Sequence, residues 1–184
     1  MAKRRDDWRD LDWSLLAGGE GETFRGTLGD DHLVGTDFAD TFNIRQGGDD
    51  RVKAGQGRDT INVGASLNAD DRINGGAGFA DVLVLEGDYS SGLTLQTDTI
   101  SRFETIVFEG DFDYSITMAP DTRFDDNSLL VDALGAQSLH FDGSALDIRL
   151  VAQGTRLRTH CLGIQKSMTA AMAMADMKVW AHRS

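Results

Sequence analysis

Six aspartates recur at nearly even spacing in the first half of the sequence, and each stands two residues before an apolar residue. The repeated unit is D-x-U-x, where U is apolar, and successive units lie 9, 10, 9, 12 and 10 residues apart. An aspartate carboxylate supplies the hard oxygen ligands that Ca²⁺ prefers. We therefore predict calcium ligands among these aspartates: Asp31, Asp40, Asp50, Asp59, Asp71 and Asp81.

Glycines precede most of the six aspartates, and the full pattern approaches the nonapeptide G-G-x-G-x-D-x-U-x, a calcium-binding β-helix repeat. The stretch "AGQGRDTINVG" contains the best unit. Glycine suits the tight turn before each aspartate because it adopts positive φ at little cost. We expect the turn glycines to form part of the metal sites: Gly48, Gly55, Gly57, Gly76 and Gly78.

On these motifs, residues 26–86 resemble the RTX (repeats-in-toxin, hemolysin-type calcium-binding) family. The resemblance implies a right-handed parallel β-roll, with glycine-rich turns on two sides. It also implies that Ca²⁺ lies between successive turns of one side, bound by aspartate carboxylates and turn carbonyls. The apolar residues of the repeat would then point inward: Leu33, Phe42, Val52, Ile61, Ile73 and Leu83.

Two nonapeptides per coil would place alternate aspartates on the same side of the roll. We expect Asp31, Asp50 and Asp71 on one side, and the other side is predicted to hold Asp40, Asp59 and Asp81. Rows of like charge are unfavourable unless a cation neutralises them. The alternative is a glycine-rich β-solenoid without ions, in which the aspartates are only turn residues.

The overall charge favours a cation as partner. The formal net charge is −12, which disfavours nucleic acid and anionic membrane surfaces, because both select basic patches. Residues 1–150 contain no cysteine, so disulfides and thiolate zinc sites cannot stabilise them. No apolar run is long enough for a transmembrane helix.

Beyond the repeats, short strand patterns continue, and we predict an all-β chain overall. Residues 1–25 are expected to form an irregular N-terminal cap in which Trp8 and Trp13 anchor the end of the roll. Residues 87–150 are expected to add ion-free β-coils, with a separate β-sandwich as the alternative. The predicted inward residues of this extension are Leu93, Leu95, Ile106, Phe108, Ile116 and Leu139.

Residues 151–184 form an atypical tail, which is basic and contains the single cysteine, Cys161. One interpretation is an amphipathic helix with Met168, Met172 and Trp180 on one face. The other uses the genetic code: read one frame over, "MTAAMAMAD" permits glycine-rich repeat text. The tail would then be the product of a frameshift within further calcium repeats.

No catalytic motif stands out, so we expect a protein that is not an enzyme. There is neither an H-E-x-x-H zinc motif nor a G-x-S-x-G nucleophile elbow. The resemblance implies a secreted, extracellular bacterial protein that binds calcium and is exported by a type I secretion apparatus. Two alternatives are the non-catalytic part of a type I-secreted hydrolase (a protease or lipase) and part of an adhesin or surface-layer protein.

Overall fold

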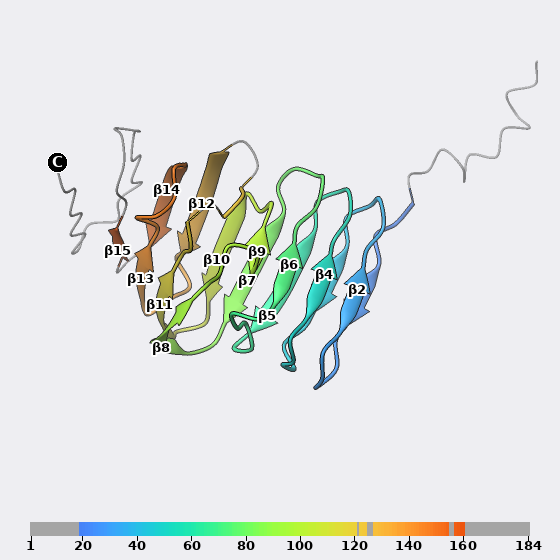
Figure 1. Cartoon of the computed structure of the whole chain (residues 1–184), viewed down its shortest axis with the longest axis horizontal. Coiled ribbons are helices and arrows are strands. Elements are labelled where there is room, and N and C mark those ends of the chain that lie inside the picture. Colours follow the sequence, from blue (N-terminus) through green and yellow to red (C-terminus); the bar gives the residue numbers. More distant parts are fainter. Residues whose placement is uncertain (1–18, 121, 125–126, 155–156, 161–184) are drawn as a thin grey trace, which may run out of the picture.

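The chain forms a β-solenoid of about six turns built from parallel sheets (Figure 1). The structure is a computed structural model, which describes residues 19–120, 122–124, 127–154 and 157–160. Every strand pairing in this part of the chain is parallel. The predicted all-β solenoid is therefore confirmed.

Three sheets make up the sides of the solenoid. The long sheet has seven strands, in the order β1 (Thr23–Arg25), β3 (Thr41–Asn43), β5 (Thr60–Gly64), β7 (Val82–Glu86), β10 (Thr105–Glu109), β12 (Ser128–Ala133) and β14 (Arg149–Gly154). A four-stranded sheet faces its first half, in the order β2 (His32–Val34), β4 (Arg51–Lys53), β6 (Arg72–Asn74) and β9 (Ile100–Ser101). A second four-stranded sheet follows along the chain, in the order β15 (Leu157–His160), β13 (Ser138–Asp142), β11 (Asp113–Thr117) and β8 (Tyr89–Thr94).

The short strands follow from the alternating pattern of the repeat. In a three-residue strand such as β4, only the middle side chain points inward, because side chains alternate between the two faces of a sheet. Val52 is accordingly 1% exposed between the exposed Arg51 and Lys53. Five of the six predicted inward residues of the repeats are buried, and Leu33 near the first coil is partly buried against the same core.

Residues 87–150 extend the solenoid and do not form a separate sandwich. Strands β10 and β12 continue the long sheet in parallel register with β7. Of the predicted inward residues in this region, all are buried except Leu93, which is partly buried. After β7, the sheet opposite the long sheet changes. Strand β8 begins the second four-stranded sheet, and β9 ends the first.

Two buried tyrosines bridge neighbouring coils in this region. The Tyr89 hydroxyl donates to the carbonyl of Gly64 (3.0 Å) and accepts from the N–H of Leu67 (3.0 Å). The Tyr114 hydroxyl accepts from the N–H of Gly87 (3.2 Å). These contacts satisfy backbone polar groups near the point where the solenoid changes from the first four-stranded sheet to the second.

At both ends, part of the sequence-based prediction lies outside the described residues. The proposed cap residues Trp8 and Trp13 are among these, as are Cys161 and the rest of the tail from residue 161 on. Strands β14 and β15 continue the sheets beyond residue 150. In the described part of the chain, no helix is long and apolar enough to cross a membrane.

Candidate functional site

The predicted aspartates lie in two rows, one along each side of the repeat region. The first acidic row consists of Asp31, Asp50 and Asp71. The backbone N–H of Asp31 donates to Oδ1 of Asp50 (3.0 Å), and the N–H of Asp50 donates to Oδ1 of Asp71 (2.8 Å). The carboxylates of Asp50 and Asp71 are therefore fixed against the coil before them, and the alternation of sides agrees with the spacing of the repeats.

The second acidic row contains the other three aspartates in the same arrangement. The N–H of Asp40 donates to Oδ1 of Asp59 (2.8 Å), and the N–H of Asp59 donates to Oδ1 of Asp81 (2.8 Å). At the start of this row, the N–H of Glu22 donates to Oδ1 of Asp40 (2.6 Å). The contacts repeat from coil to coil because the strands that follow the aspartates pair in register.

Glu104 extends the second acidic row by one coil, which the sequence analysis missed. The N–H of Asp81 donates to Oε2 of Glu104 (2.7 Å). Glu104 directly precedes β10, as Asp81 directly precedes β7. The segment "ETIV" has the D-x-U-x form with glutamate in place of aspartate. It lacks upstream glycines, which is why the pattern did not include it.

The second oxygens of the carboxylates have different surroundings along the rows. Turn N–H groups donate to Oδ2 of Asp31, Asp40 and Asp71, at 2.6, 2.6 and 2.8 Å. By contrast, Oδ2 of Asp59 and Oε1 of Glu104 are buried and have no hydrogen-bond partner within the described structure. Buried polar atoms are nearly always satisfied, so these two oxygens are the ones that a bound ligand would complete.

The predicted glycines form the turns that stack beside the aspartates. Gly55 has φ +118°, and a Cβ there would lie 2.0 Å from the carbonyl oxygen of Thr36 in the preceding coil. Only glycine permits both this backbone conformation and this approach. The other predicted glycines also lie against the turn of the coil before, within distances that exclude a Cβ: Gly48, Gly57, Gly76 and Gly78.

Burial makes the charged form of these carboxylates unfavourable. Asp50, Asp59 and Asp71 are at most 3% exposed. Burial raises the pKa of each above its ordinary value, and neighbouring aspartates raise the pKa of Asp50 and Asp59 further. Hydrogen bonds from backbone N–H groups oppose the shift in all three.

Little positive charge offsets the rows. Arg72 lowers the pKa of Asp71, but it is the weakest of the contributions there. An exposed salt bridge joins Arg45 to Glu86, away from both rows (2.5 Å). Within the described ranges, no three His, Cys, Asp or Glu side chains gather closely enough to hold a metal ion by themselves. A cation bound here would take one carboxylate per coil and complete its shell with backbone carbonyls and water.

Comparison of the chain with family models, curated proteins and solved structures finds no match.

Proposed function

We propose that the two acidic rows bind Ca²⁺ and that binding stabilises the coils of the repeat region. The observation that supports this most directly is Asp59. Its carboxylate is fully buried, its pKa is raised by burial, and its Oδ2 has no hydrogen-bond partner among the described residues. A buried ionised carboxylate requires a compensating partner, and a hard divalent cation suits an anionic oxygen beside turn carbonyls.

Calcium fits these residues better than a transition metal. The described parts of both rows offer carboxylate oxygens and backbone carbonyls, without cysteine or histidine. Oxygen-only sites suit Ca²⁺, and they are poor sites for metals that prefer imidazole or thiolate. The aspartates of both rows would hold the ions, and Glu104 would close the second row.

The proposed role of the ion is structural. Without it, buried carboxylates at successive coils repel each other and oppose folding. A ligand that binds only the folded chain stabilises that state by mass action. At the affinities of about 10⁻⁴–10⁻³ M that are usual for extracellular calcium modules, folding would respond to external calcium.

This behaviour suits a secreted bacterial protein, and we propose that class for the chain. Where calcium is scarce, the acidic repeats would stay loose, which suits export through a type I secretion apparatus. Outside the cell, calcium would complete the fold. The module would then act as a calcium-dependent scaffold in the extracellular space, with no catalytic step assigned to it.

Equilibrium dialysis of the whole chain with radioactive Ca²⁺ tests the proposal. We expect saturable binding of more than one ion per chain, which an equal concentration of Mg²⁺ does not displace, because Mg²⁺ gives up its water reluctantly. Absence of saturable binding at millimolar Ca²⁺ would leave a solenoid whose aspartates serve only as turn residues.

A further inference from the structure

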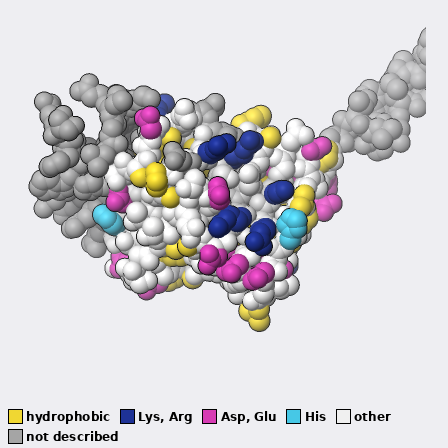
Figure 2. Space-filling model, viewed as in Figure 1, with side chains coloured by type: hydrophobic (Ala, Val, Ile, Leu, Met, Phe, Trp, Pro, Cys, Tyr) yellow, Lys and Arg dark blue, Asp and Glu magenta, His cyan; other side chains and the backbone are white. Residues whose placement is uncertain are grey.

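The outer face of the first four-stranded sheet has a regular array of basic side chains. His32, Arg51 and Arg72 lie opposite one another in register on β2, β4 and β6. Two residues further along β4, Lys53 lies between Val34 and Asn74. We call His32, Arg51, Lys53 and Arg72 the basic strip. Figure 2 shows Lys and Arg side chains gathered on this face, with acidic side chains along one border.

Three of the four residues of the basic strip are exposed and have no ion-pair partner among the described residues: Arg51, Lys53 and His32. Arg72 is partly buried; it donates to the carbonyls of Ala69 and Asp71 and also lowers the pKa of the Asp71 carboxyl. Like charges directly opposite on neighbouring strands destabilise a sheet, so the strip lowers stability unless something anionic covers it.

The strip belongs to one side of the solenoid. On the long sheet, the outward positions of the same coils are uncharged from β3 to β5, where Thr41 pairs with Thr60 and Asn43 with Asn62. The basic residues recur because both "DDR" segments, and "DDH" before them, place a basic residue directly after an aspartate of the first acidic row. The first aspartates of these pairs form the acidic border: Asp30, Asp49 and Asp70.

We propose that the basic strip binds a linear anionic polysaccharide that runs across strands β2, β4 and β6. Adjacent strands are about 4.7–4.9 Å apart, close to the length of one sugar unit, so one acidic sugar could meet each strand. Arg51 and Lys53 would contact carboxylate or sulfate groups, and Arg72 would do so at the next coil. The exposed border carboxylates can accept hydrogen bonds from sugar hydroxyls.

The surface favours a polysaccharide over other polyanions. Single-stranded nucleic acids bind where aromatic side chains stack on the bases, and the outward residues of β2, β4 and β6 include no Phe, Tyr or Trp. Binding to a membrane surface draws on buried apolar side chains as well as on basic ones, and Val34 is the only apolar residue in the outward positions of these three strands. A narrow chain can instead contact the strip alone.

The test measures binding of the whole chain to immobilised dextran sulfate in Ca²⁺, with uncharged dextran and polyuridylate as comparison ligands. The double variant Arg51→Gln/Lys53→Gln removes two exposed charges from the strip. Its matched control, Arg25→Gln/Arg58→Gln, removes two exposed charges elsewhere, with Arg25 on the long sheet and Arg58 in a turn. Circular dichroism of each variant reports folding separately, so a failure of the proposed calcium role is distinguishable from a failure of the strip.

We expect dextran sulfate to bind and dextran not to bind. Arg51→Gln/Lys53→Gln should weaken binding at least about fivefold and lower the slope of log affinity against log salt by about two, while the control stays near the unmodified chain. Equal losses in both variants would overturn the proposal, as would equal binding of dextran. Tighter binding of polyuridylate than of dextran sulfate would overturn the assignment to polysaccharide.

Discussion

At the scale of single residues, Asp59 shows how one side chain can oppose folding in one condition and support it in another. It is fully buried, and the Asp40 N–H satisfies only its Oδ1. Without a cation, its charge is a cost to the folded state. With the cation that we propose, the same carboxylate would become a ligand. The sign of its contribution to stability would therefore depend on calcium.

Replacing Asp59 with asparagine tests this change of sign. Asp59→Asn should raise the midpoint of thermal unfolding in calcium-free buffer, because it removes a buried charge, and lower the stabilisation that millimolar Ca²⁺ provides. Asp111→Asn, at an exposed loop position, is the control and should leave both unchanged. A variant that responds to Ca²⁺ as the unmodified chain does would exclude Asp59 as a ligand.

The Tyr89 hydroxyl allows a prediction that does not involve calcium. Tyr89→Phe would leave the Gly64 carbonyl and the Leu67 N–H buried without their partner. Such a loss destabilises a protein by about 1–3 kcal/mol, measurable by urea denaturation at fixed Ca²⁺. A change below about 0.5 kcal/mol, the range of ordinary surface substitutions, would mean that water replaces the hydroxyl.

At the scale of elements, the stacked turns depend on glycine at particular positions. Gly55→Ala would place a Cβ against the Thr36 carbonyl at a positive φ, which we expect to destabilise the chain by about 1–3 kcal/mol in urea denaturation. Gly29→Ala is the matched control, because a Cβ there meets no atom within 4 Å. Equal effects of the two substitutions would contradict the close stacking of the turns.

The acidic rows also predict opposite pH dependence with and without calcium. Burial raises the pKa values of Asp50, Asp59 and Asp71 in the folded chain. The stability gained by protonating these three carboxyl groups is therefore complete below the ordinary aspartate pKa of about 3.9. It is lost as pH rises through the raised values.

In calcium-free buffer, unfolding by urea should therefore require less denaturant at pH 7 than at pH 4.5. In saturating Ca²⁺ the order should reverse, because protons compete with the ion for the carboxylates. The same pH trend in both conditions would show that the rows do not exchange protons for calcium.

The spacing of the repeats was sufficient to predict much of the arrangement of the strands and turns. Alternation of D-x-U-x units predicts which aspartates share a side, and the apolar position of each unit predicts the core. Two features escaped the pattern. Glu104 stands 23 residues after Asp81 and follows Phe103 in place of glycines. The change from the first four-stranded sheet to the second at β8 depends on pairing between strands far apart in the sequence, which no local motif indicates.

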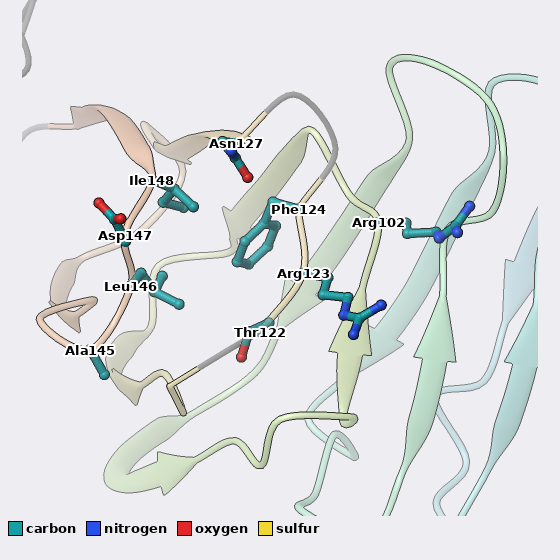
Figure 3. A pocket seen from close by; sticks show the side chains of 9 residues that line it. All are labelled: Arg102, Thr122, Arg123, Phe124, Asn127, Ala145, Leu146, Asp147 and Ile148. Carbon is teal, nitrogen blue, oxygen red and sulfur yellow. The ribbon is translucent and has the colours of Figure 1, made fainter.

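The extension has a pocket of about 400 Å³, lined in part by Arg102 and Arg123 (Figure 3). Arg102 also reaches back toward the repeats, where its guanidinium donates to the Gly76 carbonyl (3.4 Å). The repeats and the extension are thus joined by a side-chain contact as well as by the long sheet. In saturating Ca²⁺, this continuity predicts that the repeats and the extension unfold together.

At the scale of the whole molecule, the long sheet couples the acidic rows to the extension. In this sheet, β1, β3, β5 and β7 lie beside the second acidic row, and β10, β12 and β14 continue the same sheet. The extension buries aromatic side chains such as Phe108, whose ring lies 4.9 Å from that of Tyr114, and we expect its core to form without an ion. In such a chain, the extension would already be folded without calcium, and the repeats would fold onto it when calcium binds.

The central claim is that calcium completes the fold of the repeat region, and far-UV circular dichroism of the whole chain during a Ca²⁺ titration tests it most directly. We predict a cooperative gain of β-sheet signal at about 10⁻⁴–10⁻³ M Ca²⁺, with no comparable gain in Mg²⁺. A spectrum already fully β in chelator, and unchanged by Ca²⁺, would contradict the claim and leave the acidic rows without a metal-dependent role in folding.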